Sequence, residues 1–138
     1  MGKPSKSAGR GLAPASAGLV ARAAAYDLSV VLVFLLFGAG AHDSASRGAG
    51  HIVALTATFL VALAEGWAVT RAWRSPARLW PTGVVVWLVT VVVGVVLRGL
   101  LIPDAGFARG FLIVTTLFLG VTLLGWRLLA RIRRPGSA

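Results

Sequence analysis

Two acidic residues lie inside stretches of sequence that are otherwise apolar. Asp27 is surrounded by Ala, Val, Leu and Phe, and Glu65 lies in a second stretch of the same kind. A charge in the middle of a bilayer costs at least about 2.5–3.5 kcal/mol, so such residues usually face protein groups of opposite charge. We therefore expect both carboxylates to point inward. Arg127 follows the fourth apolar stretch on the same predicted side of the membrane and could reach them. We therefore predict an inner polar layer of Asp27, Glu65 and Arg127.

The inner layer of Asp27, Glu65 and Arg127 has two interpretations. In the first, each carboxylate pairs with a basic residue and has a structural role, which costs little near the end of a helix. In the second, Asp27 and Glu65 share a proton or a cation, because a neighbouring negative charge raises the pKa of a carboxyl group. The sequence alone leaves both open.

A second group of polar residues is predicted at the opposite side of the apolar stretches. Arg98 ends the third stretch, and His42, Asp43 and Asp104 fall in the connections on the same side. These four residues form a predicted outer polar layer. Arg98 either pairs with Asp43 or Asp104, or contacts an anion or a substrate.

The chain carries no motif of a known catalytic site, such as a P-loop, H-E-x-x-H or G-x-S-x-G. It contains no cysteine and two histidines without a metal-binding spacing. Ser44 and Ser46 lie near His42 and Asp43, but a short loop rarely supplies the geometry of a catalytic triad. We therefore predict a protein that is not an enzyme, with no catalytic residue, no cofactor and no bound metal.

The elements that position these residues are four long apolar segments. Of the 138 residues, 57% are hydrophobic, and the segments cover about 23–41, 52–70, 79–102 and 110–127. A helix of about 20 residues spans the hydrocarbon core of a bilayer, whereas a lone strand would leave its backbone unpaired there. We predict an all-α membrane protein, a bundle of four transmembrane helices made antiparallel by short connections.

The basic residues predict how the bundle is oriented. Lys and Arg number 14 against 4 Asp and Glu, and most lie in the two tails and in the connection between the second and third segments. Basic flanks mark the cytoplasmic side. We expect a plasma-membrane domain over 23–129, a disordered basic cytoplasmic tail over 1–22 and a second cytoplasmic tail over 130–138. Anionic lipid headgroups are the expected partners of this surface, and nucleic acid is not.

One alternative concerns the first segment. A basic start, an apolar stretch and the small residues Ala39, Gly40 and Ala41 are also typical of a cleaved secretory signal. Asp27 and the length of the stretch argue against cleavage. Cleavage would leave three spans.

Helical periodicity predicts which faces point inward, at about 100° per residue. The predicted faces are Asp27, Phe34 and Gly38 on the first segment; Ala54, Thr58, Ala62, Gly66 and Thr70 on the second; and Gly83, Trp87, Thr90, Gly94 and Arg98 on the third. The small residues of the second segment permit close helix packing. We expect a homodimer across this face if the chain builds a transport path. Trp73, Trp80 and Trp126 are expected at the membrane interface.

The third segment carries a run of residues typical of one family. The run contains Trp80, Pro81, Gly83, Trp87, Thr90, Gly94 and Arg98, and the first segment adds Asp27, Gly38 and His42. Over roughly 24–127 the chain resembles the small prokaryotic membrane proteins catalogued as domain of unknown function 3054. It departs from that pattern at Ala39–Ala41, where basic residues are common, and at Thr58, where proline is common. The resemblance implies a four-helix membrane fold and no particular activity.

Two functions follow from these predictions. The first is a membrane protein that binds a small solute or ion, or passes it through a polar bundle interior. The second is a structural or accessory subunit that packs against another membrane protein or anionic lipid. A cavity that joins the two polar layers would favour transport, and a dry core with satisfied ion pairs would favour the accessory role.

Overall fold

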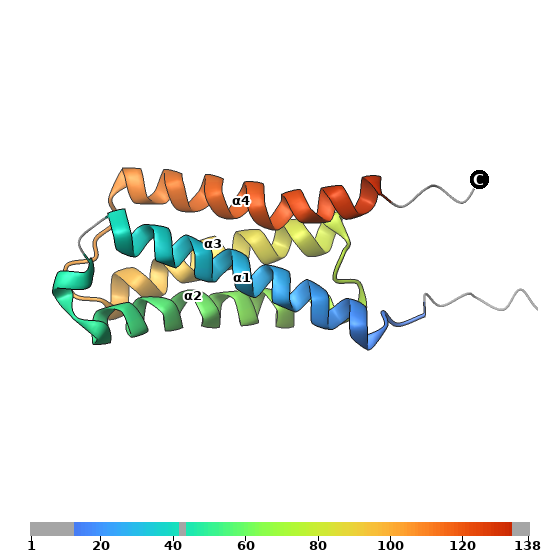
Figure 1. Cartoon of the computed structure of the whole chain (residues 1–138), viewed down its shortest axis with the longest axis horizontal. Helices are drawn as coiled ribbons and strands as arrows, with labels where there is room; N and C mark the ends of the chain where they lie inside the picture. Colours follow the sequence, from blue (N-terminus) through green and yellow to red (C-terminus); the bar gives the residue numbers. More distant parts are fainter. Residues whose placement is uncertain (1–12, 42–43, 134–138) are drawn as a thin grey trace, which may run out of the picture.

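The fold is a bundle of four long helices that lie side by side and alternate in direction (Figure 1). The computed structural model describes residues 13–41 and 44–133. The helices are α1 (Ala17–Ala41), α2 (Ala49–Thr70), α3 (Val84–Leu101) and α4 (Arg109–Ile132). The short turn η1 (Ser44–Arg47) lies between α1 and α2, and η2 (Ala72–Arg74) and η3 (Leu79–Gly83) lie between α2 and α3. The prediction of an all-α, four-helix membrane bundle is confirmed, because the described residues form four helices long and apolar enough to cross a membrane.

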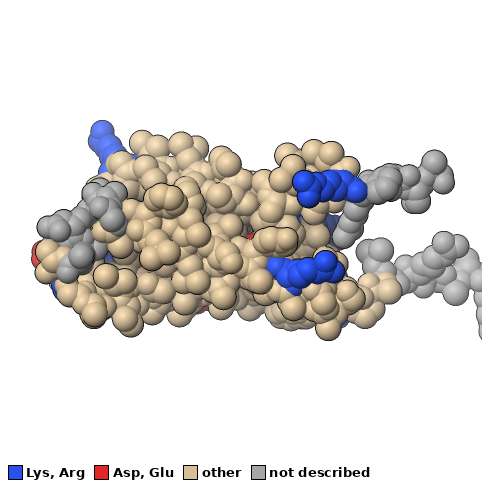
Figure 2. Space-filling view, viewed as in Figure 1, with Lys and Arg blue, Asp and Glu red and all other residues tan. Residues whose placement is uncertain are grey.

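The bundle has two chemically distinct ends (Figure 1). The described chain begins and ends at one of them, together with the connection 71–78, and we call this the tail end. The connections that follow α1 and α3 lie at the other, which we call the loop end. On the face shown in Figure 2, Lys and Arg gather at these two ends and leave a broad band of other residues between them.

Two helices extend beyond the predicted boundaries. α1 begins at Ala17, inside the region 1–22 that we expected to be disordered, because Ser16 caps it. The Ser16 carbonyl accepts hydrogen bonds from the amides of Leu19 and Val20, and its hydroxyl accepts a further one from Leu19. At the other extreme α4 continues to Ile132. Hydropathy marks only the most apolar part of a span, whereas the helix itself continues into the polar flanks.

The small residues of α2 pack against α3 of the same chain. Thr58, Ala62 and Gly66 are buried, and a Cβ added to Gly66 would lie 3.1 Å from the backbone oxygen of Val86. Across the same contact, a Cβ on Gly94 would lie 2.6 Å from the ring of Phe59. The buried part of this face is therefore used for packing within the chain, and a homodimer across α2 stays a prediction.

An apolar core separates the two ends of the bundle. The fully buried residues Val31, Phe59, Val86 and Leu119 come one from each helix, and the rings of Phe34 and Phe59 meet edge to face with centroids 5.4 Å apart. The buried hydroxyl of Thr90 donates to the carbonyl of Val86 in its own helix at 2.7 Å, whereas the buried hydroxyl of Thr115 has no hydrogen-bond partner among the described residues. This apolar packing lies between Arg127 at the tail end and Arg98 at the loop end.

Candidate functional site

A buried ion pair between α1 and α4 dominates the tail end. Asp27 and Arg127 are both completely buried. Nη1 of Arg127 donates to Oδ1 of Asp27 at 2.9 Å, and Nη2 donates to Oδ2 at 2.6 Å. This two-fold contact matches the planar fork of the guanidinium to the two carboxylate oxygens, which is the strongest geometry for such a pair.

Two tryptophans complete the hydrogen bonding of the carboxylate. Nε1 of Trp126 donates to Oδ1 at 2.8 Å, and Nε1 of Trp67 donates to Oδ2 at 2.9 Å. Each oxygen of Asp27 therefore accepts two hydrogen bonds. These four hydrogen bonds occupy the lone pairs of both oxygens, so the carboxylate has no acceptor position left for a further ligand.

The guanidinium of Arg127 is held equally firmly. Its Nε donates to the carbonyl of Pro76 at 3.0 Å, and Nη1 donates a second time to the carbonyl of Leu123 at 2.9 Å. Its Cζ lies 4.4 Å from the centre of the Trp126 ring, a cation–π distance. The contacts of Arg127 thus connect α1, α4 and the connection between α2 and α3.

The local backbone makes room for this arginine. Gly83, the last residue of η3, lies beside it, and a Cβ there would come within 2.6 Å of Cδ of Arg127. The preceding Trp80 has extended rather than helical backbone angles. Glycine at position 83 is therefore required by the close approach of the arginine side chain.

Glu65 is not part of this site. It is exposed on α2, between Ala64 and the buried Gly66, and among the described residues it makes no hydrogen bond and no ion pair. The prediction that Glu65 points inward is wrong, because one residue along a helix turns the side chain by about 100°. The hypothesis that Asp27 and Glu65 share a proton falls with it, since Arg127 is the charged partner of Asp27.

Trp67 was not among the predicted site residues, and Trp126 was expected only at the membrane interface. Both side chains are half-buried and donate to Asp27. The available signal was depth: because α2 and α4 run toward the tail end, Trp67 and Trp126 near their C-terminal ends come to the same side of the bundle as Asp27. Trp73 and Trp80, in contrast, are 47% and 70% exposed at the tail end, as an interfacial position requires.

Arg98 lies at the loop end and has no carboxylate partner among the described residues. Its Nη1 donates to the carbonyl of Gly106 at 2.8 Å, and its Cζ lies 3.9 Å above the ring of Phe111. Asp104 lines the same cavity without forming an ion pair with it. The predicted Arg98–Asp104 pair is therefore absent, and His42 and Asp43 lie outside the described residues.

A cavity of about 740 Å³ opens beside Arg98. Its apolar wall comes from α1 and α4 and includes Phe34, Phe37, Phe111, Val114 and Phe118. Its charged or titratable lining consists of Arg47, His51, Arg98 and Asp104. The volume falls within the range of about 300–1,000 Å³ that small-molecule sites occupy. This cavity can hold an apolar group with a cationic neighbourhood at one side.

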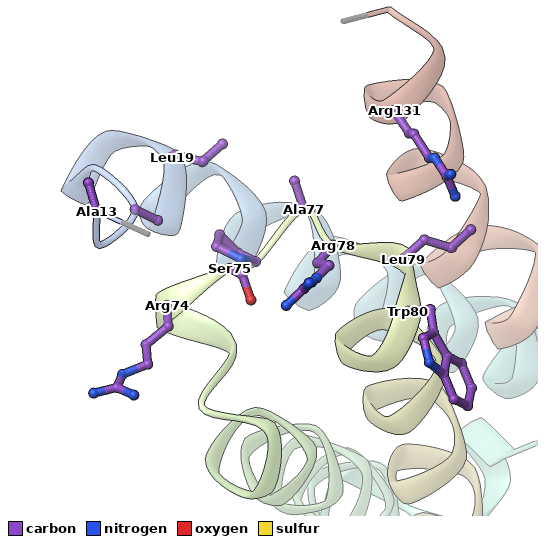
Figure 3. A pocket seen from close by; sticks show the side chains of 11 residues that line it. Ala13, Leu19, Arg74, Ser75, Ala77, Arg78, Leu79, Trp80 and Arg131 are labelled. Atoms are coloured by element: carbon purple, nitrogen blue, oxygen red, sulfur yellow. The ribbon is translucent and has the colours of Figure 1, made fainter. Parts of the chain in front are cut away.

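A second hollow, of about 680 Å³, lies at the tail end. Arg74, Arg78 and Arg131 line it, and no acidic side chain does. Figure 3 shows Arg78 beside Leu79, Arg131 reaching in from α4, and Arg74 extending away on the other side. Pro76 contributes to the wall and is the residue whose carbonyl receives Nε of Arg127.

The inward stripe of α3 is confirmed residue by residue. Nε1 of Trp87 donates to the carbonyl of Thr116 at 3.1 Å, and its ring lies against Gly120. Thr90 and Gly94 are buried, and Arg98 continues the stripe to the loop-end cavity. The stripe therefore connects α3 to both α2 and α4.

Fold and site together define a multi-pass membrane protein, a four-helix bundle joined at one end by a buried Asp–Arg pair. The family model described as protein of unknown function (DUF3054) matches residues 24–130. The chain belongs to this family, which confirms the resemblance carried by the third segment. No curated protein and no solved structure matches the chain.

Proposed function

We propose that this protein binds a small solute in the loop-end cavity and does not conduct a solute or ion through the bundle. One observation carries the proposal: the two polar regions differ in what remains available to a ligand. Both oxygens of Asp27 are already occupied by Arg127, Trp67 and Trp126. Arg98 faces an open cavity with no carboxylate paired to it among the described side chains.

The apolar core supports binding over conduction. Phe59, Val86 and Leu119 are fully buried and belong to the apolar cluster between the two ends. An ion crossing this layer would lose its hydration without receiving polar ligands, which costs many kcal/mol. We therefore propose a binding role.

The orientation belongs to the same proposal. With both termini and the connection 71–78 in the cytoplasm, the tail-end hollow and its arginines would face the anionic leaflet of the plasma membrane. Reporter fusions after Ala138 and within 71–78 should then both report a cytoplasmic location. A reporter active only outside the cytoplasm at either position would reverse the orientation.

A ligand screen by thermal stability, run beside a flux assay, tests the function. The full chain in nanodiscs should unfold at a higher temperature with a ligand, since saturation at 100 times Kd adds about 2.7 kcal/mol of stability. Arg98→Gln should abolish that shift, and Arg109→Gln should leave it, because Arg109 is exposed outside the cavity. Liposomes with the protein should show no saturable flux. A flux that Asp27→Asn eliminates would overturn the proposal in favour of transport.

A second candidate function, an accessory subunit, is favoured by the position of Glu65. This carboxylate lies about 7–8 Å from the end of α2 on an exposed face that it shares with small residues. Those residues are Ala54, Ala57, Val61, Ala64 and Ala68. A helix with small residues and a basic side chain at matching depth would fit this face and would compensate the charge.

The absence of cysteine from the chain provides a direct test of the accessory role. A single cysteine at Val61, which is 49% exposed, should crosslink to a partner in native membranes, and Glu65→Gln should reduce the crosslink. A cysteine at Val92 on α3 is the matched control. Equal crosslinking at both positions, or none at Val61, would remove this candidate.

A further inference from the structure

The loop-end cavity has the chemistry of a site for one class of ligand. Its wall is aromatic and aliphatic, and among the described residues its charged rim contains two arginines and one histidine against one aspartate. The proposed function specifies only a small solute. The composition of the cavity indicates which chemical class of solute fits. An apolar wall next to a cationic rim fits a molecule with an apolar body and an anionic head.

The two arginines of the rim repel each other. Coulombic repulsion acts between Arg47 and Arg98, which line the same cavity from η1 and α3. Arg98 has its guanidinium face on Phe111 and one nitrogen on the carbonyl of Gly106, which leaves other N–H groups available. An anion between the two guanidiniums would relieve the repulsion and accept charge-assisted hydrogen bonds.

The helix ends strengthen the positive potential of this rim. α2 and α4 both begin at the loop end, and neither has an acidic residue in its first turn or a side-chain cap. His51 in the first turn of α2 and Gly110 in the first turn of α4 line the cavity. The positive ends of two helix dipoles therefore add to the charges of Arg47 and Arg98.

The cavity is also reachable from the lipid side. Phe37 and Val114 belong to its wall and are 70% and 58% exposed on α1 and α4. Gly38 lines it as well, and a Cβ there would meet nothing within 4 Å. Arg98 lies within one turn of the end of α3, the depth at which a headgroup meets water. A membrane amphiphile can enter between α1 and α4 with its head at this level.

We propose, on the basis of the binding function above, that the loop-end cavity binds a single-chain anionic amphiphile drawn from the bilayer. The anionic head lies between Arg98 and Arg47, and the acyl chain lies against Phe34, Phe111 and Phe118. One chain is specified, because a cavity of about 740 Å³ is of the size that holds one small molecule.

Binding of radiolabelled palmitate to the full chain in nanodiscs of zwitterionic lipid tests this directly. Saturable binding is expected, with competition by unlabelled palmitate and not by methyl palmitate. Arg98→Gln should weaken it about ten- to a hundredfold, the loss expected when a hydrogen bond to a charged group disappears. Arg109→Gln, at the same end but outside the cavity, should bind as the wild type does.

A second pair of variants tests the position of the acyl chain. Gly38→Leu should fill the cavity and abolish binding, whereas Gly125→Leu makes the same change in open space on α4 and should have no effect. Neither added side chain begins with a clash, so both variants are expected to fold. Equal binding by the two variants would overturn the assignment of the chain to this cavity.

The remaining outcomes separate this inference from the function on which it rests. Competition by acetate or inorganic phosphate as strong as that by palmitate would retain solute binding and overturn the amphiphile. Competition by methyl palmitate as strong as that by palmitate would overturn the role of the anionic head. Saturable binding of an anionic two-chain phospholipid, with no binding of palmitate, would overturn the single chain. Absence of binding by every probe, with no ligand found in the thermal screen, would overturn both.

Discussion

Arg127 and Arg98 occupy opposite ends of the bundle and show what an arginine does when its partners differ. Arg127 is completely buried, shares two hydrogen bonds with Asp27 and donates to two backbone carbonyls. Arg98 is half-buried, lies on Phe111 and donates to one carbonyl beside a cavity. The first charge is neutralised inside the protein. The second is compensated by no carboxylate among the described residues.

The difference indicates which polar residues of this bundle are available to bind a ligand. A saturated pair fixes the relative positions of helices and leaves no group for a ligand. An arginine beside an open cavity has donors to spare, and the fold provides no counter-charge to hold them. For this reason we propose a structural role for the tail end and ligand binding at the loop end.

The largest expected effect is the loss of the buried pair. Arg127→Met leaves the carboxylate of Asp27 buried with only the two tryptophan donors, and we expect the free energy of unfolding to fall by about 3–5 kcal/mol. Titration with a denaturing detergent in mixed micelles measures this loss. Arg98→Met is the control at the other end and should cost about 1 kcal/mol or less, because no buried charge is left behind. Equal losses in the free energy of unfolding would show that the two arginines contribute equally to stability.

Replacing both members of the pair should cost less than replacing one. In Asp27→Leu with Arg127→Met, no unpaired charge remains and the new side chains are apolar, so the double variant should be more stable than Arg127→Met alone. The same detergent titration on all four proteins of the cycle gives the coupling. A double variant as unstable as the sum of the two single variants would show that Asp27 and Arg127 act independently.

A smaller effect is expected at the tryptophans. Trp126→Phe removes one hydrogen bond to Asp27 and keeps most of the aromatic surface against Arg127, so about 1–2 kcal/mol should be lost. Trp80→Phe is the matched control, because Trp80 is 70% exposed and donates no hydrogen bond within the described chain. A loss at position 80 equal to that at position 126 would place the effect of Trp126 in interfacial anchoring instead.

Most of the fold could be predicted from the sequence, because length and hydropathy alone decide which segments cross a bilayer. The helices, their alternation and the inward stripe of α3 through Trp87, Thr90 and Gly94 follow from these properties. Arg127 was also in the predicted inner layer. The rotation of each helix about its axis was harder to predict. Glu65 and Gly66 are neighbours in sequence, but Glu65 is exposed and Gly66 is buried.

The rest depended on contacts that no local pattern encodes. Trp67 reaches Asp27 over a separation of 40 residues, and Trp126 reaches it over 99. Arg98 and Asp104 have opposite charges close together in sequence, which favours a pair. In the folded chain the carbonyl of Gly106 and the ring of Phe111 take the guanidinium instead. Only the packed arrangement of α3 against α4 decides between these partners.

The last prediction compares one glycine at each end, and the smallest change is expected at Gly38. Gly38→Ala adds a methyl group where nothing lies within 4 Å, and removing glycine from the helix should stabilise the protein by about 0.5–1 kcal/mol. Gly83→Ala adds the same group 2.6 Å from Cδ of Arg127. That side chain cannot withdraw without losing its bond to the carbonyl of Pro76, so about 1–3 kcal/mol should be lost. Opposite signs in the detergent titration would confirm that the tail end is packed and the loop end is open. A loss at both positions would mean that the space beside Gly38 is already filled, and the cavity that we assign to a ligand would then have no room for one.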